Sequence, residues 1–123
     1  MNAIAIGSKQ LIRDYFDALS GHPKTEALLE RFTTDPSLKD HIRAAEAAFP
    51  EYELVAHEMV ADGDLVAVRG TFQGVHKGEF AGIRPTGRRI TADLMLFYRI
   101  DDGRIAEHWM QLDMKGILDQ LSS

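Results

Sequence analysis

The triplet Glu107-His108-Trp109 near the end of the chain is the strongest candidate for chemistry in this sequence. It lies in a stretch that alternates like a β-strand, so His108 shares one face with Met110 and Leu112, and Glu107 shares the other with Trp109. A histidine that faces a cavity titrates near neutral pH and can serve as a general acid or base. The other interpretation is a hydrogen-bonded core histidine beside a packing tryptophan, and both stay open.

Two aspartates could assist such a histidine. Asp93 begins an apolar stretch, and Asp113 follows the end of another. A carboxylate at the lip of an apolar cavity can carry protons, because burial there disfavours its charged form. The simpler interpretation is an aspartate that ends a strand or caps a helix, and it suits Asp113 best because a short helix is predicted directly after it.

Several other reaction classes lack their motifs. The sequence has no phosphate loop of the form GxxxxGK[ST], no HExxH and no GxSxG. Its five histidines are scattered without an i, i+4 pair, so we expect no metal site, and the absence of cysteine excludes disulfides and cysteine nucleophiles. Four basic residues around Pro85-Thr86-Gly87 either clamp an anion or, as we favour, solvate a loop: Lys77, Arg84, Arg88 and Arg89.

Composition limits the partners. With 123 residues, 45% apolar and 27% charged, the chain is typical of one globular domain spanning residues 1–123. Its net charge of 14 − 19 = −5 argues against nucleic-acid binding, and no apolar run is long enough to span a membrane. The first ten residues lack the basic and apolar segments of a secretion signal. We therefore expect a cytoplasmic protein without nucleic-acid or membrane partners.

The elements that must position these residues fall into two groups. Apolar residues at helical spacing predict helices over residues 4–19, 25–32 and about 38–49, separated by segments that contain glycine or proline. After Pro50 the pattern changes to strands at 51–61, 65–72, 90–100 and 104–112, with two Asp-Gly turns and a short closing helix near 115–121. Helices followed by an antiparallel meander predict an α+β fold with the helices on one face of the sheet.

Two details refine this expectation. The segments 65–68 and 94–98 are apolar on both faces, whereas a sheet with one wet face should alternate. A partner subunit would cover the second face, so we predict a homodimer through the sheet. The glycines at 70, 74, 78 and 82 suggest bulges and sharp bends in a strongly curved sheet.

Residues 49–121 resemble the SnoaL-like polyketide cyclase family of the NTF2-like superfamily. The landmarks occur in the family's order and at nearly its spacing: Phe49-Pro50, Asp62-Gly63-Asp64, Gly78-Glu79-Phe80, Gly82-Ile83, Pro85-Thr86-Gly87-Arg88-Arg89, Asp102-Gly103-Arg104-Ile105 and Glu107-His108-Trp109. The resemblance implies a conical, strongly curved sheet wrapped around a long helix, with an apolar pocket inside and usually dimers. It also implies aldol cyclisation of a polyketide without metal or cofactor, in which an aspartate moves the proton.

This chain departs from that pattern at the proton-transfer position. Met110 stands where the family's aspartate follows the triplet, and Leu94 and Leu96 stand where cyclases place polar pocket groups. A thioether cannot accept a proton at neutral pH, so the family mechanism does not transfer directly. The fold also hosts isomerases, dehydratases, epoxide hydrolases and binding modules, so the fold alone does not decide the reaction.

Three hypotheses follow for a hydrophobic small molecule as the partner. In the first, a relocated enzyme uses His108 as acid–base group, Tyr98 as oxyanion donor and Asp93 or Asp113 in support. Its expected pocket lining is Tyr15, Phe16, Leu94, Leu96, Met110 and Leu112. In the second, the same apolar pocket only binds a ligand. The third is an isomerase in which Tyr15 and Asp40 act together, and it ranks last because no acid stands on the strand.

Overall fold

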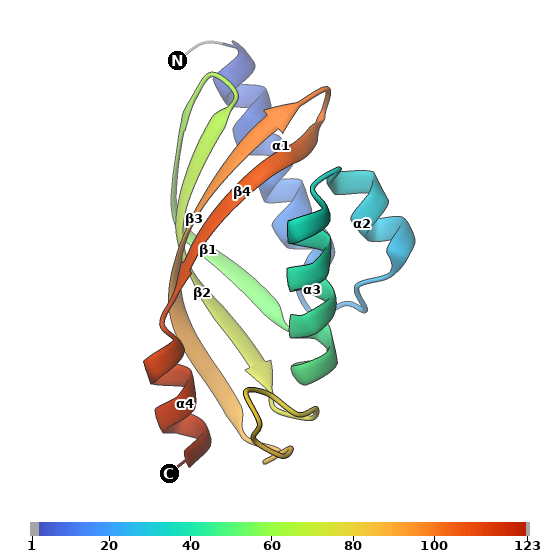
Figure 1. The fold of residues 1–123 in the computed structure, drawn as a ribbon. Helices are drawn as coiled ribbons and strands as arrows, with labels where there is room; N and C mark the ends of the chain where they lie inside the picture. The colour runs from blue at the N-terminus through green and yellow to red at the C-terminus, as the bar shows by residue number, and fades with distance from the viewer. Residues whose placement is uncertain (1–2, 123) are drawn as a thin grey trace.

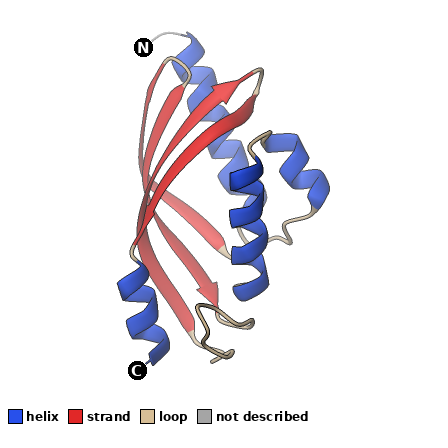
Figure 2. Cartoon of the chain, viewed as in Figure 1, coloured by secondary structure: helices blue, strands red, loops and turns tan. Residues whose placement is uncertain are grey.

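The computed structural model describes residues 3–122, and Met1, Asn2 and Ser123 lie outside the described residues. The elements follow in the order α1 (Ala3–Leu19), α2 (Glu26–Phe32), α3 (Pro36–Ala48), β1 (Glu53–Asp62), β2 (Leu65–Val75), β3 (Arg89–Asp101), β4 (Arg104–Leu112) and α4 (Met114–Ser122). The first three helices lie on the concave side of a curved sheet, so the predicted α+β architecture is confirmed (Figures 1 and 2). Among the described helices, none is long and apolar enough to cross a membrane.

The sheet is a four-stranded antiparallel meander in the order β1-β2-β3-β4. The pairing of β1 with β2 shifts register between Ala56 and Glu58, which places a bulge at His57. A β-carbon on Gly70, opposite this bulge, would lie only 2.4 Å from the carbonyl oxygen of Val55. Glycine therefore allows the two strands to approach closely where the sheet bends.

Strand β3 shows how the sheet separates core from surface. Its even-numbered residues from Ile90 to Tyr98 are buried under the helices, and the odd-numbered residues that alternate with them are exposed. The exposed set includes Met95 and Phe97, so the second apolar face predicted from the sequence is uncovered in the single chain. The covered face forms the concave wall of the site described below.

Helix α3 begins earlier than its apolar pattern indicates. The side chain of Asp35 accepts a hydrogen bond from the amide of Ser37 and so caps the helix, while Pro36 occupies its first turn. Proline suits this position because the missing N–H would have no partner inside the helix. The cap fixes Asp35 beside the strands.

Helix α4 completes the edge of the sheet beyond the end of β4. The side-chain amide of Gln120 pairs with the backbone of Thr91 on β3, accepting from its N–H at 3.0 Å and donating to its carbonyl at 2.8 Å. These bonds take the place of a neighbouring strand and protect the exposed edge. Asp113 accepts from the amide of Gly116 at 2.9 Å at the start of the helix, which is the capping role that the sequence favoured.

Candidate functional site

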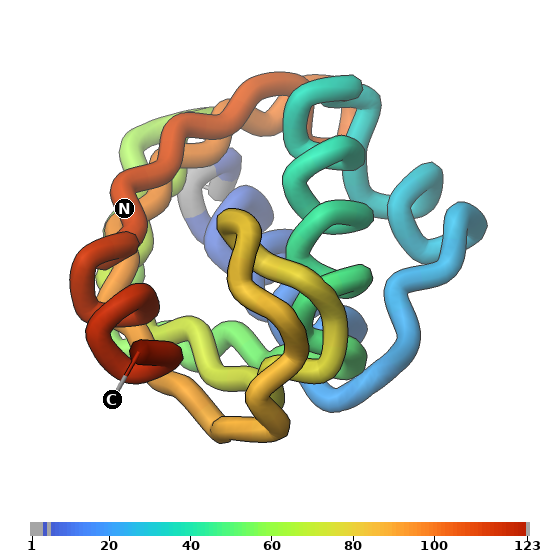
Figure 3. Tube along the Cα trace, turned by 60° about the horizontal axis from the view of Figure 1, so that its bottom comes forward, coloured from blue at the N-terminus to red at the C-terminus, as the bar shows by residue number. Residues whose placement is uncertain are grey.

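A small apolar cavity of about 80 Å³ lies between α3 and the concave face of the sheet. In Figure 3, α3 (green) stands across from the curved strands, and the segment between β2 and β3 (yellow) passes in front. The polar groups of the cavity wall come from three tyrosines and two histidines. The wall consists of Tyr15, Leu38, His41, Ile42, Ala45, Tyr52, Leu54, Phe72, Leu94, Leu96, Tyr98, His108, Met110 and Leu112.

His108 connects β4 to the start of α3. Its Nδ1 lies 2.8 Å from a carboxylate oxygen of Asp35, and its Nε2 lies 3.2 Å from Nδ1 of His41. The side chain of His108 is 4% exposed and that of Asp35 is 13% exposed. A histidine held by a carboxylate at the wall of an apolar cavity is an arrangement suited to general acid–base catalysis.

The carboxylate of Asp35 is stabilised in its charged form. Partial burial opposes ionisation, but hydrogen bonds from His108 and from the amide of Ser37 outweigh it and lower the pKa of Asp35 below its ordinary value. An ionised carboxylate accepts hydrogen bonds and donates none, so it orients the imidazole of His108 by accepting from Nδ1–H.

Tyr98 lies opposite His108 in the pairing of β3 with β4, and both side chains line the cavity. Burial, with a smaller contribution from neighbouring Tyr52, raises the pKa of Tyr98 well above its ordinary value. Its hydroxyl group therefore stays protonated and able to donate. Within the described residues, no hydrogen-bond partner is found for the hydroxyls of Tyr98 and Tyr15. Their rings pack edge to face, with centroids 5.9 Å apart.

The structure brings most of the residues singled out from the sequence to this cavity. His108 and Tyr98 line it together with five of the expected lining residues, namely Tyr15, Leu94, Leu96, Met110 and Leu112. Met110 is 37% exposed, which places it at the mouth. Phe16 is absent from the lining, although its ring packs edge to face with that of Tyr98, with centroids 6.3 Å apart.

Asp93, expected to support His108, and Asp40, expected to act with Tyr15 in an isomerase, both lie elsewhere. Asp93 is exposed on the convex face of β3, where it lines a separate hollow with Arg69 and Gln111, because β-strand alternation turns it away from Leu94. Asp40 forms an ion pair with Arg43 at 3.1 Å on the exposed surface of α3. Neither carboxylate lines the cavity.

Asp35 and His41 are the site residues that sequence reasoning missed. The segment around Asp35-Pro36 reads only as a break between helices, although its residue types also signal a helix start. Asp35 lies 73 positions before His108, and no local pattern connects positions so far apart. A search restricted to helix caps would have found Asp35 but not its partner.

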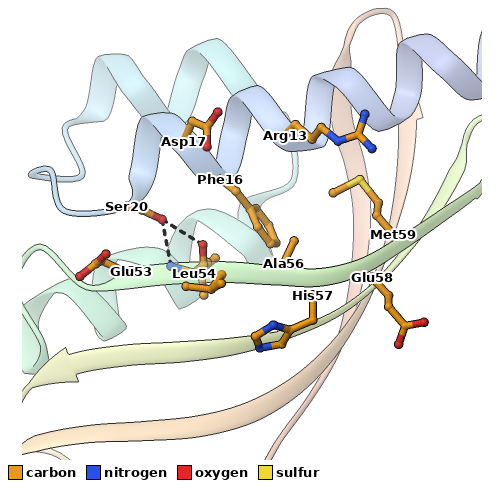
Figure 4. A pocket seen from close by; sticks show the side chains of 11 residues that line it. Arg13, Phe16, Asp17, Ser20, Glu53, Leu54, Ala56, His57, Glu58 and Met59 are labelled. Atoms are coloured by element: carbon orange, nitrogen blue, oxygen red, sulfur yellow. Dashed lines mark hydrogen bonds between the residues drawn. The ribbon is translucent and has the colours of Figure 1, made fainter.

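A larger hollow of about 470 Å³ lies between α1 and β1, but its chemistry is weaker (Figure 4). It is an open groove that includes the exposed residues Arg13, Asp17 and Glu58. At one end of the groove, the hydroxyl of Ser20 donates to the carbonyl of Leu54 at 3.1 Å and accepts from the N–H of Leu54 at 2.9 Å. We therefore regard the cavity beside His108 as the candidate site.

Two of the four basic residues around Pro85-Thr86-Gly87 form hydrogen bonds with other parts of the protein. Arg88 donates to the carbonyl of Gln120 at 2.9 Å, and Arg89 donates to the side chain of Gln73 at 3.2 Å. Within residues 3–122, no group of three or more side chains is arranged to hold a metal ion.

The lowered pKa of Asp35 predicts how stability depends on acid. Because this pKa lies below the ordinary value of 3.8, the stabilisation from Asp35 is complete above pH 3.8 and is lost as the pH falls through the lower folded-state value. An Asp35→Asn variant should be about 1–2 kcal/mol less stable at neutral pH, since a charge-assisted hydrogen bond becomes a neutral one. It should also lose less of its stability on acidification.

Urea unfolding at several pH values between 7 and 2.5 measures both effects. Asp40→Asn is the matched control, because Asp40 lies on the same helix with its side chain 77% exposed. Equal acid dependence of the wild type and Asp35→Asn would contradict the assignment.

Comparison with known proteins places this chain in a family. Residues 12–121 match the family profile described as SnoaL-like polyketide cyclase. A search of curated proteins found no significant match. Among solved structures, AclR from Streptomyces galilaeus, a candidate hydroxylase, has 25% identity and a TM-score of 0.81 over 96% of this chain and 82% of its own.

Two further structures have the same fold. IdmH from Streptomyces antibioticus, a candidate polyketide cyclase, has 25% identity and a TM-score of 0.76, covering 94% of this chain and 99% of its own. A protein from Jannaschia sp. CCS1 has only 17% identity but a TM-score of 0.80, covering 100% of this chain and 96% of its own. The fold is thus retained at low identity, and the side chains of the site must indicate the chemistry.

Proposed function

Because the chain belongs to the SnoaL-like polyketide cyclase family, we propose that it performs cofactor-independent acid–base chemistry on a small hydrophobic, polyketide-like substrate. The observation that carries this proposal is the 2.8 Å hydrogen bond between Asp35 and His108 at the wall of an apolar cavity. Reactions that fit are cyclisation, isomerisation and related lyase or hydrolase steps, each of which needs a side chain that accepts or donates a proton.

The proposed roles follow from the side chains. Asp35 orients His108 and stabilises the imidazolium that forms when His108 takes up a proton. The hydroxyl of Tyr98 donates a hydrogen bond to the developing enolate oxygen. Met110, in place of the family's aspartate, contributes an apolar wall at the mouth, and the acid–base function moves two residues back along β4 to His108.

The size of the cavity limits the substrate. Drug-sized ligands occupy pockets of roughly 300–1,000 Å³, whereas this cavity has about 80 Å³. It accommodates one small ring or the reacting end of a longer molecule. Any remainder of the substrate would extend past Met110 toward solvent.

The alternative is a non-catalytic module that binds a hydrophobic ligand. Its supporting observation is that the wall away from the histidines is apolar, with Leu94, Leu96 and Leu112 on the strands and Leu38 and Ile42 on α3. Burial of a small ligand against such a wall needs no titratable group.

Exchange of the α-protons of cyclohexanone in D₂O, followed by NMR, distinguishes these functions. The proposal predicts exchange faster than in buffer with imidazole at the same concentration as the protein. Binding without faster exchange would indicate the ligand-binding module. If cyclohexanone neither binds nor exchanges its protons faster than in buffer, both functions are overturned.

We also propose that the protein forms a homodimer through the convex face of the sheet. Four large apolar side chains are exposed there, namely Val60, Met95, Phe97 and Trp109. Strand pairing makes the patch continuous, since Phe97 lies opposite both Trp109 and Ala67, and Ala67 lies opposite Val60. An apolar surface of this kind on a soluble protein is typical of an interface.

A Phe97→Glu variant should therefore be monomeric at concentrations where the wild type is dimeric. A charge in the centre of the patch would be desolvated on association, and dimer affinity should fall about 100-fold or more. Analytical ultracentrifugation from 1 to 100 µM measures it, with Thr91→Glu as the control on the same strand and face. A wild type that sediments as a monomer throughout this range would refute the dimer.

A further inference from the structure

Hydrogen-bond donors and acceptors can be assigned along the series Asp35, His108 and His41. From them we infer that Nε2 of His41, rather than either nitrogen of His108, exchanges the proton with the ligand. His108 then acts as a relay that positions His41 and shares the charge. This inference rests on the proposed acid–base function and identifies the group that would contact the substrate.

The ionised carboxylate of Asp35 fixes where the protons of the two histidines lie. Ionised Asp35 can only accept, so Nδ1 of His108 carries the proton of their 2.8 Å bond. In the neutral imidazole the other nitrogen then has no proton, and Nε2 of His108 must accept in its 3.2 Å contact with His41. Nδ1 of His41 is therefore the donor, and Nε2 of His41 is left with a free lone pair.

The surroundings favour the same nitrogen. Both nitrogens of His108 have protein partners, and its side chain is 4% exposed. His41 is exposed and also lines the cavity, one turn of α3 after Leu38 and one turn before Ala45. Its Nε2 has no hydrogen-bond partner among the described residues. A base at this position meets both the ligand and bulk water, where it can discharge its proton.

The proton step balances without any further reactant. Nε2 of His41 takes a proton from the carbon next to a carbonyl, and the electron pair of the C–H bond remains on the substrate as an enolate. The proton on Nδ1 of His41 then moves to Nε2 of His108, so the positive charge lies beside the carboxylate of Asp35. The reverse transfers return a proton to the product.

The heavy-atom geometry fits both protonation states. The two imidazole rings are nearly perpendicular, at 89° with centroids 5.1 Å apart. The hydrogen between Nδ1 of His41 and Nε2 of His108 can be bound to either nitrogen without a change in their positions. Accepting a proton requires no rotation of either ring. A relay that needs no reorganisation is favourable for catalysis.

Nitrogen-15 NMR of the imidazole rings tests the assignment without any substrate. In the neutral state, we expect both His108 and His41 to carry their proton on Nδ1. The Nδ1–H form is the minor tautomer of a free histidine side chain, so its presence at His41 would report the hydrogen bond to His108. A proton on Nε2 of His41 in the neutral state would overturn the inference.

Cyclohexanone exchange supplies the second test. If Nε2 of His41 contacts the ligand, His41→Gln should lower the enzyme-catalysed rate as strongly as His108→Gln. If His108 acts directly, His41→Gln should stay within about threefold of the wild type, and the inference fails while the proposed function stands. Absence of exchange in the wild type would instead refute the proposed function. His22→Gln is the control, because His22 lies in an exposed loop outside the cavity.

Discussion

Replacing His108 with glutamine is expected to reduce catalysed proton exchange by roughly 100-fold or more, to the rate of buffer alone. Removing a positioned general base typically costs 10²–10⁴ in rate. Glutamine keeps polar atoms near Asp35, but an amide cannot accept a proton at neutral pH. The effect is expected whether His108 acts directly or through His41.

The His108→Gln variant is expected to fold. The thermal unfolding midpoint of His108→Gln should stay within a few degrees of the wild type, because the side-chain amide of glutamine can still donate to Asp35, as Nδ1 of His108 does at 2.8 Å. His22→Gln should exchange like the wild type. A folded His108→Gln variant with undiminished exchange would refute the role of this histidine.

Replacing Gly78 with alanine is expected to destabilise the fold by about 3 kcal/mol, which is a large effect for one methyl group. The amides of Lys77 and Gly78 donate to the carbonyl of Ala48 at 3.0 and 3.1 Å and complete the end of α3. A β-carbon on Gly78 would lie 2.0 Å from the carbonyl oxygen of Ala47 and 3.2 Å from the α-carbon of Ala48. Both obstacles are backbone atoms, so either the loop or the helix end must move.

The matched control is Gly7→Ala in helix α1. A β-carbon there meets no atom within 4 Å, so only helix propensity should change. Stability should rise by about 0.5–1 kcal/mol. Chemical denaturation of both variants measures the contrast. A loss below about 1 kcal/mol for Gly78→Ala would show that the loop relaxes easily.

The same helix end matters for function. Helix α3 carries Asp35 at its start and His41 on its cavity face, and the sheet carries His108. Gly78 fixes the far end of α3 against the segment that follows β2. If Gly78→Ala is folded, we expect its proton exchange to fall as well, because the distance between His41 and His108 depends on where α3 lies.

Much of the fold could be predicted from local patterns. The apolar stretches and the Asp-Gly turns gave strands within a few residues of their observed bounds. Alternation along β4 placed His108, Met110 and Leu112 on one face, and this face lines the cavity. The place of Asp93 at the start of an apolar stretch suggests a supporting role, but alternation turns it away from Leu94 and onto the exposed face.

The apolar spacing of helix α1 predicts more burial at its start than the structure shows. Ile4 belongs to the apolar spacing of this helix, but it is 65% exposed. The first turn of α1 extends past the residues that cover it, and periodicity alone does not say where a neighbouring layer stops.

The sequence by itself determined the α+β class, the family and the position of one histidine on the concave face. These follow from periodicity, turn residues and ordered landmarks, which are properties of neighbouring residues. The tertiary structure decided which carboxylate supports His108, which second histidine meets it and how small the cavity is. Those features depend on the packing of α3 against β4, and contacts between residues 73 positions apart leave no periodic signal in a single sequence.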